Sequence, residues 1–109
     1  MKNTNVNIDL TSKYKKRFLA LFQEFLNKGI DNSIFLAKLY SFEMKIRNEH
    51  YGNSSVDCGL WFRFFNGDTG ATTISNIENY FKGSMNNYNY FIECLNLAIE
   101  SNELHVYFS

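Results

Sequence analysis

Leu60-Trp61-Phe62-Arg63-Phe64-Phe65 is the stretch that decides the fold class of this 109-residue chain. Leucine and phenylalanine at every second position alternate with tryptophan, arginine and phenylalanine, as expected of a strand with one apolar and one mixed face. Asn66-Gly67 begins a turn after it, and residues 71–74 could return as a short partner strand. The stretch favours an α+β fold. The alternative is an all-α fold, because strands this short can be misread.

Two other segments, one near each end of the sequence, alternate polar and apolar residues in the same way. Residues 104–108 predict a terminal strand, and residues 4–10 predict either a strand or a frayed N-terminus. Since the three segments lie far apart in the sequence, their sheet must be assembled by long-range pairing.

A pair of helices is predicted between these segments. Apolar residues recur at steps of three and four from Tyr14 to Leu26. Thr11 and Ser12 offer N-caps for this first helix, and Gly29 sits where a left-handed C-terminal residue belongs.

A second helix of about twenty residues follows, with Asp31, Asn32 and Ser33 as competing N-caps. Its expected inward face consists of four apolar residues spaced by four, three and four positions: Phe35, Leu39, Phe42 and Ile46. A short loop joins the two helices, so we expect an antiparallel helical hairpin.

The last third of the chain predicts two more helices. Ser75 with Glu78 forms a capping box, and the short helix behind it stops at Gly83. Asn86 or Asn87 caps the last helix. We therefore predict one domain over residues 1–109. In it the helical hairpin and a C-terminal helix pack on a small, mainly antiparallel sheet.

Composition narrows the function classes. The chain is 45% hydrophobic, enough for a core, and eleven Lys and Arg balance eleven Asp and Glu, which excludes a strongly basic nucleic-acid coat. The first residues lack the apolar core of a signal peptide, and no apolar stretch could span a bilayer. We expect a cytoplasmic protein with no membrane partner. Abundant asparagine and lysine reflect AT-rich codons and indicate a bacterial or phage source.

No motif in the sequence supports catalysis. His50, Asp57 and Cys58 lie close together in the sequence and could form a thiol-imidazole-carboxylate site. A lone thiol before an apolar strand is more often a core residue, and so is Cys94 within the last helix. Two cysteines are too few for a four-ligand zinc site, and phosphate-binding loops are missing. We expect a protein that is not an enzyme and has no cofactor.

The charges are unevenly distributed along the chain. Residues 1–55 carry nine Lys and Arg against five Asp and Glu, whereas residues 56–109 carry two against six. An acidic surface would attract a basic partner if these side chains share one face; the alternative is that they scatter over several faces. The basic half includes a run at the start of the first helix, Lys13, Lys15, Lys16 and Arg17. Together with Lys38 and Lys45, that run offers the alternative of nucleic-acid binding.

The stretch Phe22-Gln23-Glu24-Phe25-Leu26-Asn27-Lys28-Gly29-Ile30-Asp31, followed by an amphipathic helix, resembles the opening of small bacterial immunity proteins of the colicin D type. Those proteins neutralise a partner toxin by covering its active site. The resemblance covers about the first 45 residues and rests on a helix-Gly-helix pattern. It implies a toxin-inhibiting function and transfers no individual site residues. The strands predicted at residues 60–65 and 104–108 depart from the pattern of that family.

We therefore expect a small binding protein that neutralises a macromolecular partner by occlusion, such as a toxin-immunity protein or a phage inhibitor of a host defence. The alternative is a nucleic-acid-binding regulator that uses the basic first helix. The partner is expected to be a protein with a basic surface, met by acidic side chains and by the aromatic and arginine types that anchor interfaces. The candidate partner-binding residues are Asp57, Trp61, Arg63, Asp68, Glu78, Tyr88, Tyr90, Glu93 and Tyr107.

Overall fold

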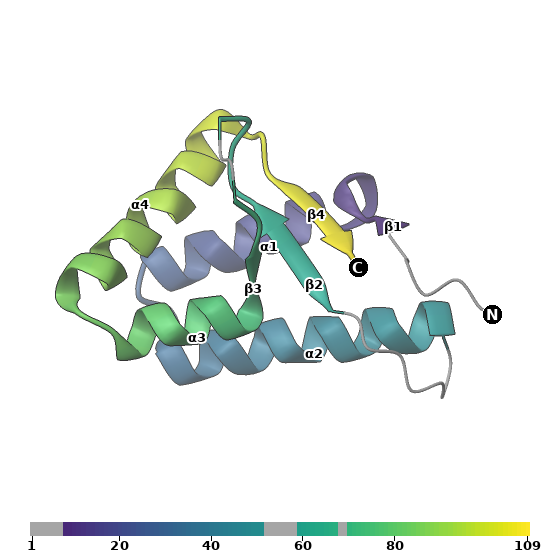
Figure 1. The fold of residues 1–109 in the computed structure, drawn as a ribbon, viewed down its shortest axis with the longest axis horizontal. Coiled ribbons are helices and arrows are strands. Elements are labelled where there is room, and N and C mark those ends of the chain that lie inside the picture. Colours follow the sequence, from purple (N-terminus) through teal and green to yellow (C-terminus); the bar gives the residue numbers. More distant parts are fainter. Residues whose placement is uncertain (1–7, 52–58, 68–69) are drawn as a thin grey trace.

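The computed structural model describes residues 8–51, 59–67 and 70–109 (Figure 1). It confirms the α+β prediction, with four helices and a four-stranded sheet among these residues. The elements in chain order are β1 (Ile8–Asp9), α1 (Thr11–Leu26), α2 (Asn32–Tyr51), β2 (Leu60–Arg63), β3 (Thr72–Thr73), α3 (Ile74–Lys82), α4 (Met85–Ser101) and β4 (His105–Phe108).

The sheet has the strand order β1-β4-β2-β3, and every neighbouring pair is antiparallel. β4 lies in the middle although it comes last in the chain. The register places Trp61 opposite Tyr107 on β4 and opposite Thr73 on β3, and Tyr107 opposite Asp9 on β1. One row of side chains therefore crosses all four strands.

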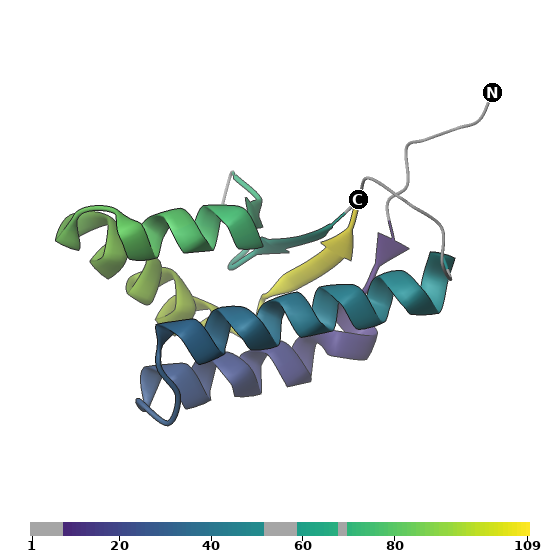
Figure 2. The same cartoon turned by 90° about the horizontal axis from the view of Figure 1, so that it is seen from below.

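Helices α1 and α2 run antiparallel on one side of the sheet, as the sequence predicted (Figure 2). The core lies between them and the sheet and is rich in phenylalanine. Phe62 of β2 packs edge-on against Phe18 and Phe22 of α1, with ring centroids 5.1 and 6.1 Å away. The ring of Phe91 brings α4 into the same cluster through Phe64, whose centroid lies 6.0 Å away. Because strand residues alternate between faces, the buried side chains of β2 and β4 leave their neighbours facing away from the helices.

The N-cap prediction for α1 is wrong. The helix begins after Leu10, which makes no side-chain capping bond, and the Asp9 carboxylate accepts a hydrogen bond from the Thr11 N–H at 3.0 Å. The Thr11 hydroxyl bonds instead to the backbone of Val106 in β4, as donor at 3.2 Å and as acceptor at 3.0 Å. The Thr11 hydroxyl therefore bonds to a distant strand and does not cap its own helix.

The end of α1 also differs from the prediction. Lys28, not Gly29, adopts the left-handed conformation, with φ 64°. The Lys28 N–H donates to Phe25 O and the Gly29 N–H donates to Glu24 O, which is the bond pattern of a Schellman motif with Lys28 at its left-handed position. A side chain at the next position would be crowded, because a Cβ at Gly29 would lie 3.1 Å from Glu24 Cγ and 3.3 Å from Glu24 O.

Of the other predicted helix ends, two are confirmed and two are wrong. Asp31 caps α2, accepting from the Ile34 N–H at 2.9 Å, and Gly83 ends α3 as predicted. The predicted Ser75–Glu78 capping box is wrong, because the N-cap of α3 is Thr73, two residues before Ser75, and its side chain accepts from the Asn76 N–H. Neither predicted asparagine caps α4. Ser84 does so instead, by accepting from the Asn87 N–H at 3.2 Å.

The predicted inward face of α2 is confirmed at three of its four positions. Phe35, Leu39 and Ile46 are fully buried, whereas Phe42 is only half-buried and packs at the edge of the core beside Phe18, with ring centroids 4.7 Å apart. Its other side borders the solvent-facing groove between α1 and α2.

Candidate binding surface

The face of the sheet that points away from α1 and α2 is the candidate binding surface. Figures 1 and 2 show both helices on one side of β2 and β4, and no described helix crosses the other side. Along β2, Leu60 and Phe62 are buried while Trp61 is half-buried and Arg63 is exposed. β4 alternates in the same way. We call the outward-facing side chains of β1, β2 and β4 the sheet-face cluster. Its members are Asp9, Trp61, Arg63, His105 and Tyr107.

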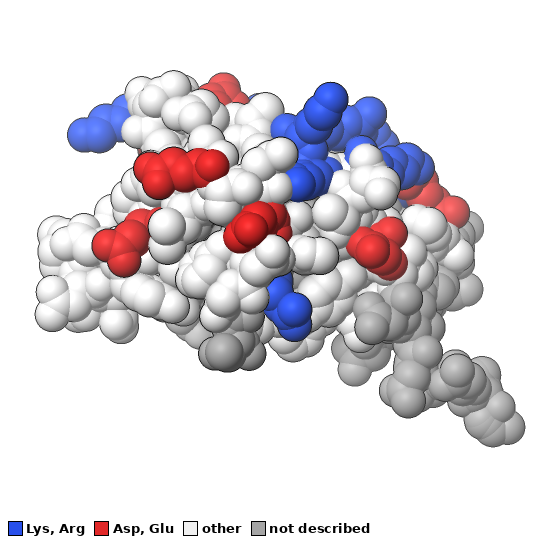
Figure 3. Space-filling view, turned by 90° about the horizontal axis from the view of Figure 1, so that it is seen from above, with Lys and Arg blue, Asp and Glu red and all other residues white. Residues whose placement is uncertain are grey.

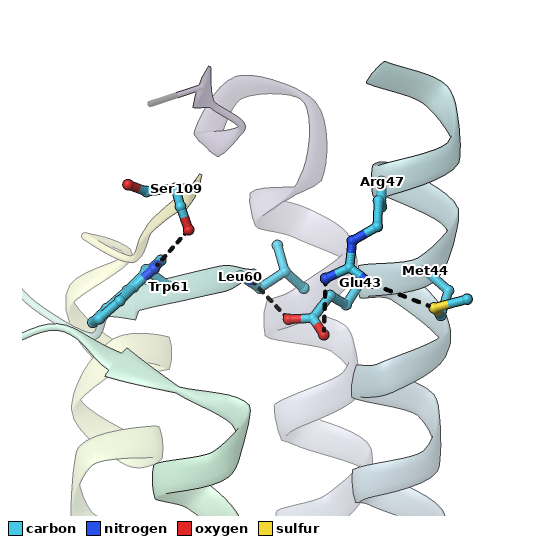
Figure 4. A network of polar contacts seen from close by, with 6 residues as sticks. All are labelled: Glu43, Met44, Arg47, Leu60, Trp61 and Ser109. Atoms are coloured by element: carbon cyan, nitrogen blue, oxygen red, sulfur yellow. Dashed lines mark hydrogen bonds and ion pairs between the residues drawn. The ribbon is translucent and has the colours of Figure 1, made fainter. Parts of the chain in front are cut away.

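Trp61 and Tyr107 form the aromatic part of this cluster. They lie directly opposite each other on β2 and β4, with ring planes 8° from parallel and centroids 6.5 Å apart. The indole N–H of Trp61 donates to the backbone carbonyl of Ser109 at 3.2 Å, which fixes the ring orientation (Figure 4). Two large, parallel rings on neighbouring strands offer apolar contact area with little conformational entropy left to lose.

Polar side chains complete the cluster beside the aromatic pair. Asp9, Arg63, His105 and Tyr107 line a hollow of about 370 Å³. Arg63 and His105 are register partners, and the Asp9 carboxylate lines the same hollow, so both signs of charge meet in a small area. The hydrogen bond from the Thr11 N–H, with a further contribution from the Thr11 side chain, lowers the pKa of Asp9, which keeps this carboxylate charged at neutral pH.

A contact between α2 and the start of β2 holds the strand that carries Trp61 (Figure 4). The Glu43 carboxylate accepts a hydrogen bond from the Leu60 N–H at 2.9 Å, beyond the point where β3 stops pairing with β2. Arg47 lies one turn further along α2, 4.0 Å from the other oxygen of Glu43 and above the ring of Phe108. This arrangement fixes β2 and β4 to the same helix, so the sheet-face cluster sits on a rigid support.

The structure brings together three of the nine residues predicted to bind a partner, namely Trp61, Arg63 and Tyr107. Tyr88 and Tyr90 lie instead on α4. The first packs on Phe81 and lines a groove beside the α1–α2 loop, and the second is exposed and packs on Tyr80.

The acidic candidates do not gather around this cluster. Glu78 lies on α3, where it accepts from the Tyr40 hydroxyl at 3.2 Å and pairs with Lys82, and Glu93 is exposed on α4. Asp57 and Asp68 lie outside the described residues. Figure 3 shows most of the Lys and Arg gathered on one side of the face it displays, whereas most Asp and Glu stand apart from one another.

The residues considered for catalysis do not form a described site. Cys94 is buried in the core, His50 is exposed at the end of α2, and Cys58 lies outside the described residues. Within the described part of the chain, no group of three His, Cys, Asp or Glu is arranged to hold a metal ion. The helices described there are also too short or too polar to cross a membrane.

Two members of the sheet-face cluster were missed by the sequence analysis, Asp9 and His105. The alternation of residues 104–108 placed His105 on the polar side of its strand, which was the available signal. The pairing of β4 with both β1 and β2 was needed to place it beside Arg63.

Comparison with known proteins adds no further identification, because no protein-family model, no curated protein and no solved structure matches the chain.

Proposed function

We propose that this chain is a non-enzymatic binding protein that neutralises a macromolecular partner by covering part of it, with the sheet-face cluster as the contact surface. The observation that supports the proposal is the parallel pair of Trp61 and Tyr107, with Arg63 beside it, on a sheet face that no described helix covers. Tryptophan, tyrosine and arginine are the residue types that dominate binding energy at protein interfaces.

The charge of this surface favours a protein over a nucleic acid. Arg63 is its one permanent cation among the described residues, and the nearby Asp9 carboxylate offsets it. Binding to a phosphate backbone needs several cations that together displace counterions. A nucleic-acid-binding regulator, the alternative function, would have to use the separate basic side of α1. A protein with a basic surface would still meet Asp9, but the aromatic pair carries the proposal.

A toxin-immunity protein or a phage inhibitor of a host defence is the form of this function that we favour, in a bacterial cytoplasm. The resemblance of the α1–loop–α2 segment to immunity proteins of the colicin D type points in this direction. Such inhibitors need one rigid patch rather than a catalytic site, because they act by occupying the surface of the partner.

The test is capture of a partner by tagged wild-type protein, followed by measurement of its affinity for surface variants. We expect Trp61→Ala to weaken binding by roughly 30-fold or more, as for an interface hot spot, and Arg63→Ala to weaken it by a smaller factor. Tyr90→Ala is the matched control, since Tyr90 is an exposed aromatic residue on α4 outside the cluster. Melting curves must show that the variants are folded.

Equal affinity of the wild-type and Trp61→Ala proteins would reject the sheet face as the contact surface. Binding of labelled single-stranded DNA or RNA at physiological salt would favour the alternative function, provided that Lys15→Ala with Lys16→Ala abolishes it.

A further inference from the structure

Two helices of this chain carry matching patterns of opposite charge. On α2, Lys38, Phe42 and Lys45 are spaced by four and three positions; on α4, Glu93, Leu97 and Glu100 have the same spacing. Residues seven positions apart lie on one face of a helix, about 10.5 Å apart along its axis. Each helix therefore presents two like charges two turns apart, with an apolar side chain between them.

The α2 pattern borders a groove. The groove lies between α1 and α2, has a volume of about 380 Å³, and has Ala20, Leu21 and Phe42 as its apolar lining. Arg17, Lys38 and Lys45 stand around it, against the single carboxylate of Glu24. An apolar floor with a cationic rim suits an amphipathic helix that carries acidic residues beside an apolar one.

Helix α4 presents acidic residues beside an exposed apolar one. Its buried side consists of Phe91, Cys94, Leu95 and Ala98, so the stripe of Glu93, Leu97 and Glu100 points away from the core. Leu97 is 38% exposed, so it offers apolar surface between the two glutamates. Among the described residues, no ion pair within 4.0 Å involves Lys38, Lys45, Glu93 or Glu100, and Lys45 interacts with Glu49 only at longer range.

We infer that the chain self-associates, with the α4 stripe of one copy seated in the α1–α2 groove of another. The α4 helix cannot occupy the groove of its own chain, because its opposite face is packed into the core. Parallel docking would set Lys38 against Glu93, Phe42 against Leu97 and Lys45 against Glu100. The contact joins two different surfaces, so it leads either to a closed ring of copies or to an open chain.

This inference gives a function to the uneven charge distribution of the sequence. The basic first half supplies the groove and the acidic second half supplies the stripe, so a protein of zero net charge carries two complementary surfaces. Neither surface includes the sheet-face cluster, which would stay free for a partner.

The test is sedimentation equilibrium of the purified chain at about 50 mM and about 500 mM salt, because screening at high salt weakens exposed ion pairs. We expect association at low salt that weakens at high salt. Lys38→Glu with Lys45→Glu should raise the dissociation constant about tenfold or more, and so should Glu93→Lys with Glu100→Lys. An equimolar mixture of the two variants should associate again, since the acidic groove of one variant matches the basic stripe of the other.

Two control variants keep the result specific. Lys16→Glu with Lys82→Glu makes the same change in net charge outside the groove and should leave association unchanged. Trp61→Ala should also leave it unchanged, which separates this inference from the proposed function. A chain that stays monomeric at about 1 mM and low salt would overturn the inference. So would association that both reversal variants retain, or that mixing them does not restore.

Discussion

The Thr11 hydroxyl and the Val106 backbone exchange two hydrogen bonds although the residues are 95 positions apart. The hydroxyl accepts from the Val106 N–H and donates to the Val106 carbonyl, which also accepts from the Leu10 N–H at 2.8 Å. One side chain at the start of α1 thus continues the pairing of the central strand beyond the two residues of β1.

Thr11→Val is expected to destabilise the protein by about 1–3 kcal/mol, because the shape is kept while the Val106 N–H loses its partner. Thr11→Ser retains the hydroxyl and should cost less. Urea denaturation monitored by tryptophan fluorescence gives both values. If the two variants had equal stability, the hydrogen bonds would not contribute.

Gly59→Ala is expected to destabilise the protein through Glu43. A Cβ at this position would lie 2.7 Å from Glu43 Oε2, the oxygen that accepts from the Leu60 N–H. The methyl group must therefore shift the carboxylate, and we expect this shift to weaken the hydrogen bond to Leu60. The cost should be about 1–3 kcal/mol in the wild-type chain and much smaller in a Glu43→Ala background. A double-mutant cycle of unfolding free energies measures the difference, and strict additivity would contradict the contact.

Lys28→Gly is expected to stabilise the protein by about 1 kcal/mol, because glycine removes the steric penalty of a side chain in the left-handed conformation. Gly29→Ala, at the neighbouring position, should have the opposite effect, since its Cβ would press on Glu24. Thermal unfolding of the two variants should shift the midpoint in opposite directions. A loss of stability in Lys28→Gly would show that the Lys28 side chain contributes more than its backbone costs.

Acid should remove the contribution of Asp9 to stability. Hydrogen bonding to Thr11 lowers the pKa of Asp9 in the folded protein below its ordinary value of 3.8. Its contribution is therefore present above about pH 4 and is lost as the pH falls through the folded pKa. The difference in melting temperature between wild type and Asp9→Asn should be constant near neutral pH and shrink below about pH 4. A difference that persists down to pH 2 would reject this account.

Burial of α2 side chains predicts an order of effects. Phe35 is fully buried and stacks on Phe25 at 4.3 Å, so Phe35→Ala should cost about 3–5 kcal/mol. Phe42→Ala should cost less, because part of its ring already faces solvent. Chemical denaturation of both variants tests the order, and a larger loss for Phe42→Ala would reverse it.

The fold class could be predicted from the sequence because its signals are local. Apolar residues at steps of three and four predict α1 and α2, and alternation around Trp61 predicts β2. These patterns do not depend on what the segments pack against. How deeply a side chain is buried cannot be predicted in this way. Phe42 lies on the same helix face as Phe35, but its burial depends on the position of α1, which the sequence of α2 does not reveal. The N-cap of α1 was predicted wrongly for a similar reason. The Thr11 hydroxyl can bond to the backbone of its own helix or to that of a neighbouring strand, and the sequence does not show which.

The candidate site was only partly predictable. Trp61 and Tyr107 were singled out by residue type, but their contact depends on the pairing of strands more than forty positions apart. For the acidic residues, the sequence shows the excess of charge but not the position of each side chain. Their excess in the second half is plain in the sequence, but a charge count does not reveal on which face a side chain lies, and Glu78 and Glu93 belong to different helices.

The place of β4 in the middle of the sheet has a consequence for synthesis on the ribosome. Among the described strands β1 pairs only with β4, and β4 joins it to β2. A nascent chain in which His105–Phe108 have not yet been synthesised therefore lacks the strand that joins β1 to β2, and it also lacks Val106 and Phe108, which belong to the core. Such a chain is open to aggregation and to chaperone binding until β4 is available to pair with β1 and β2.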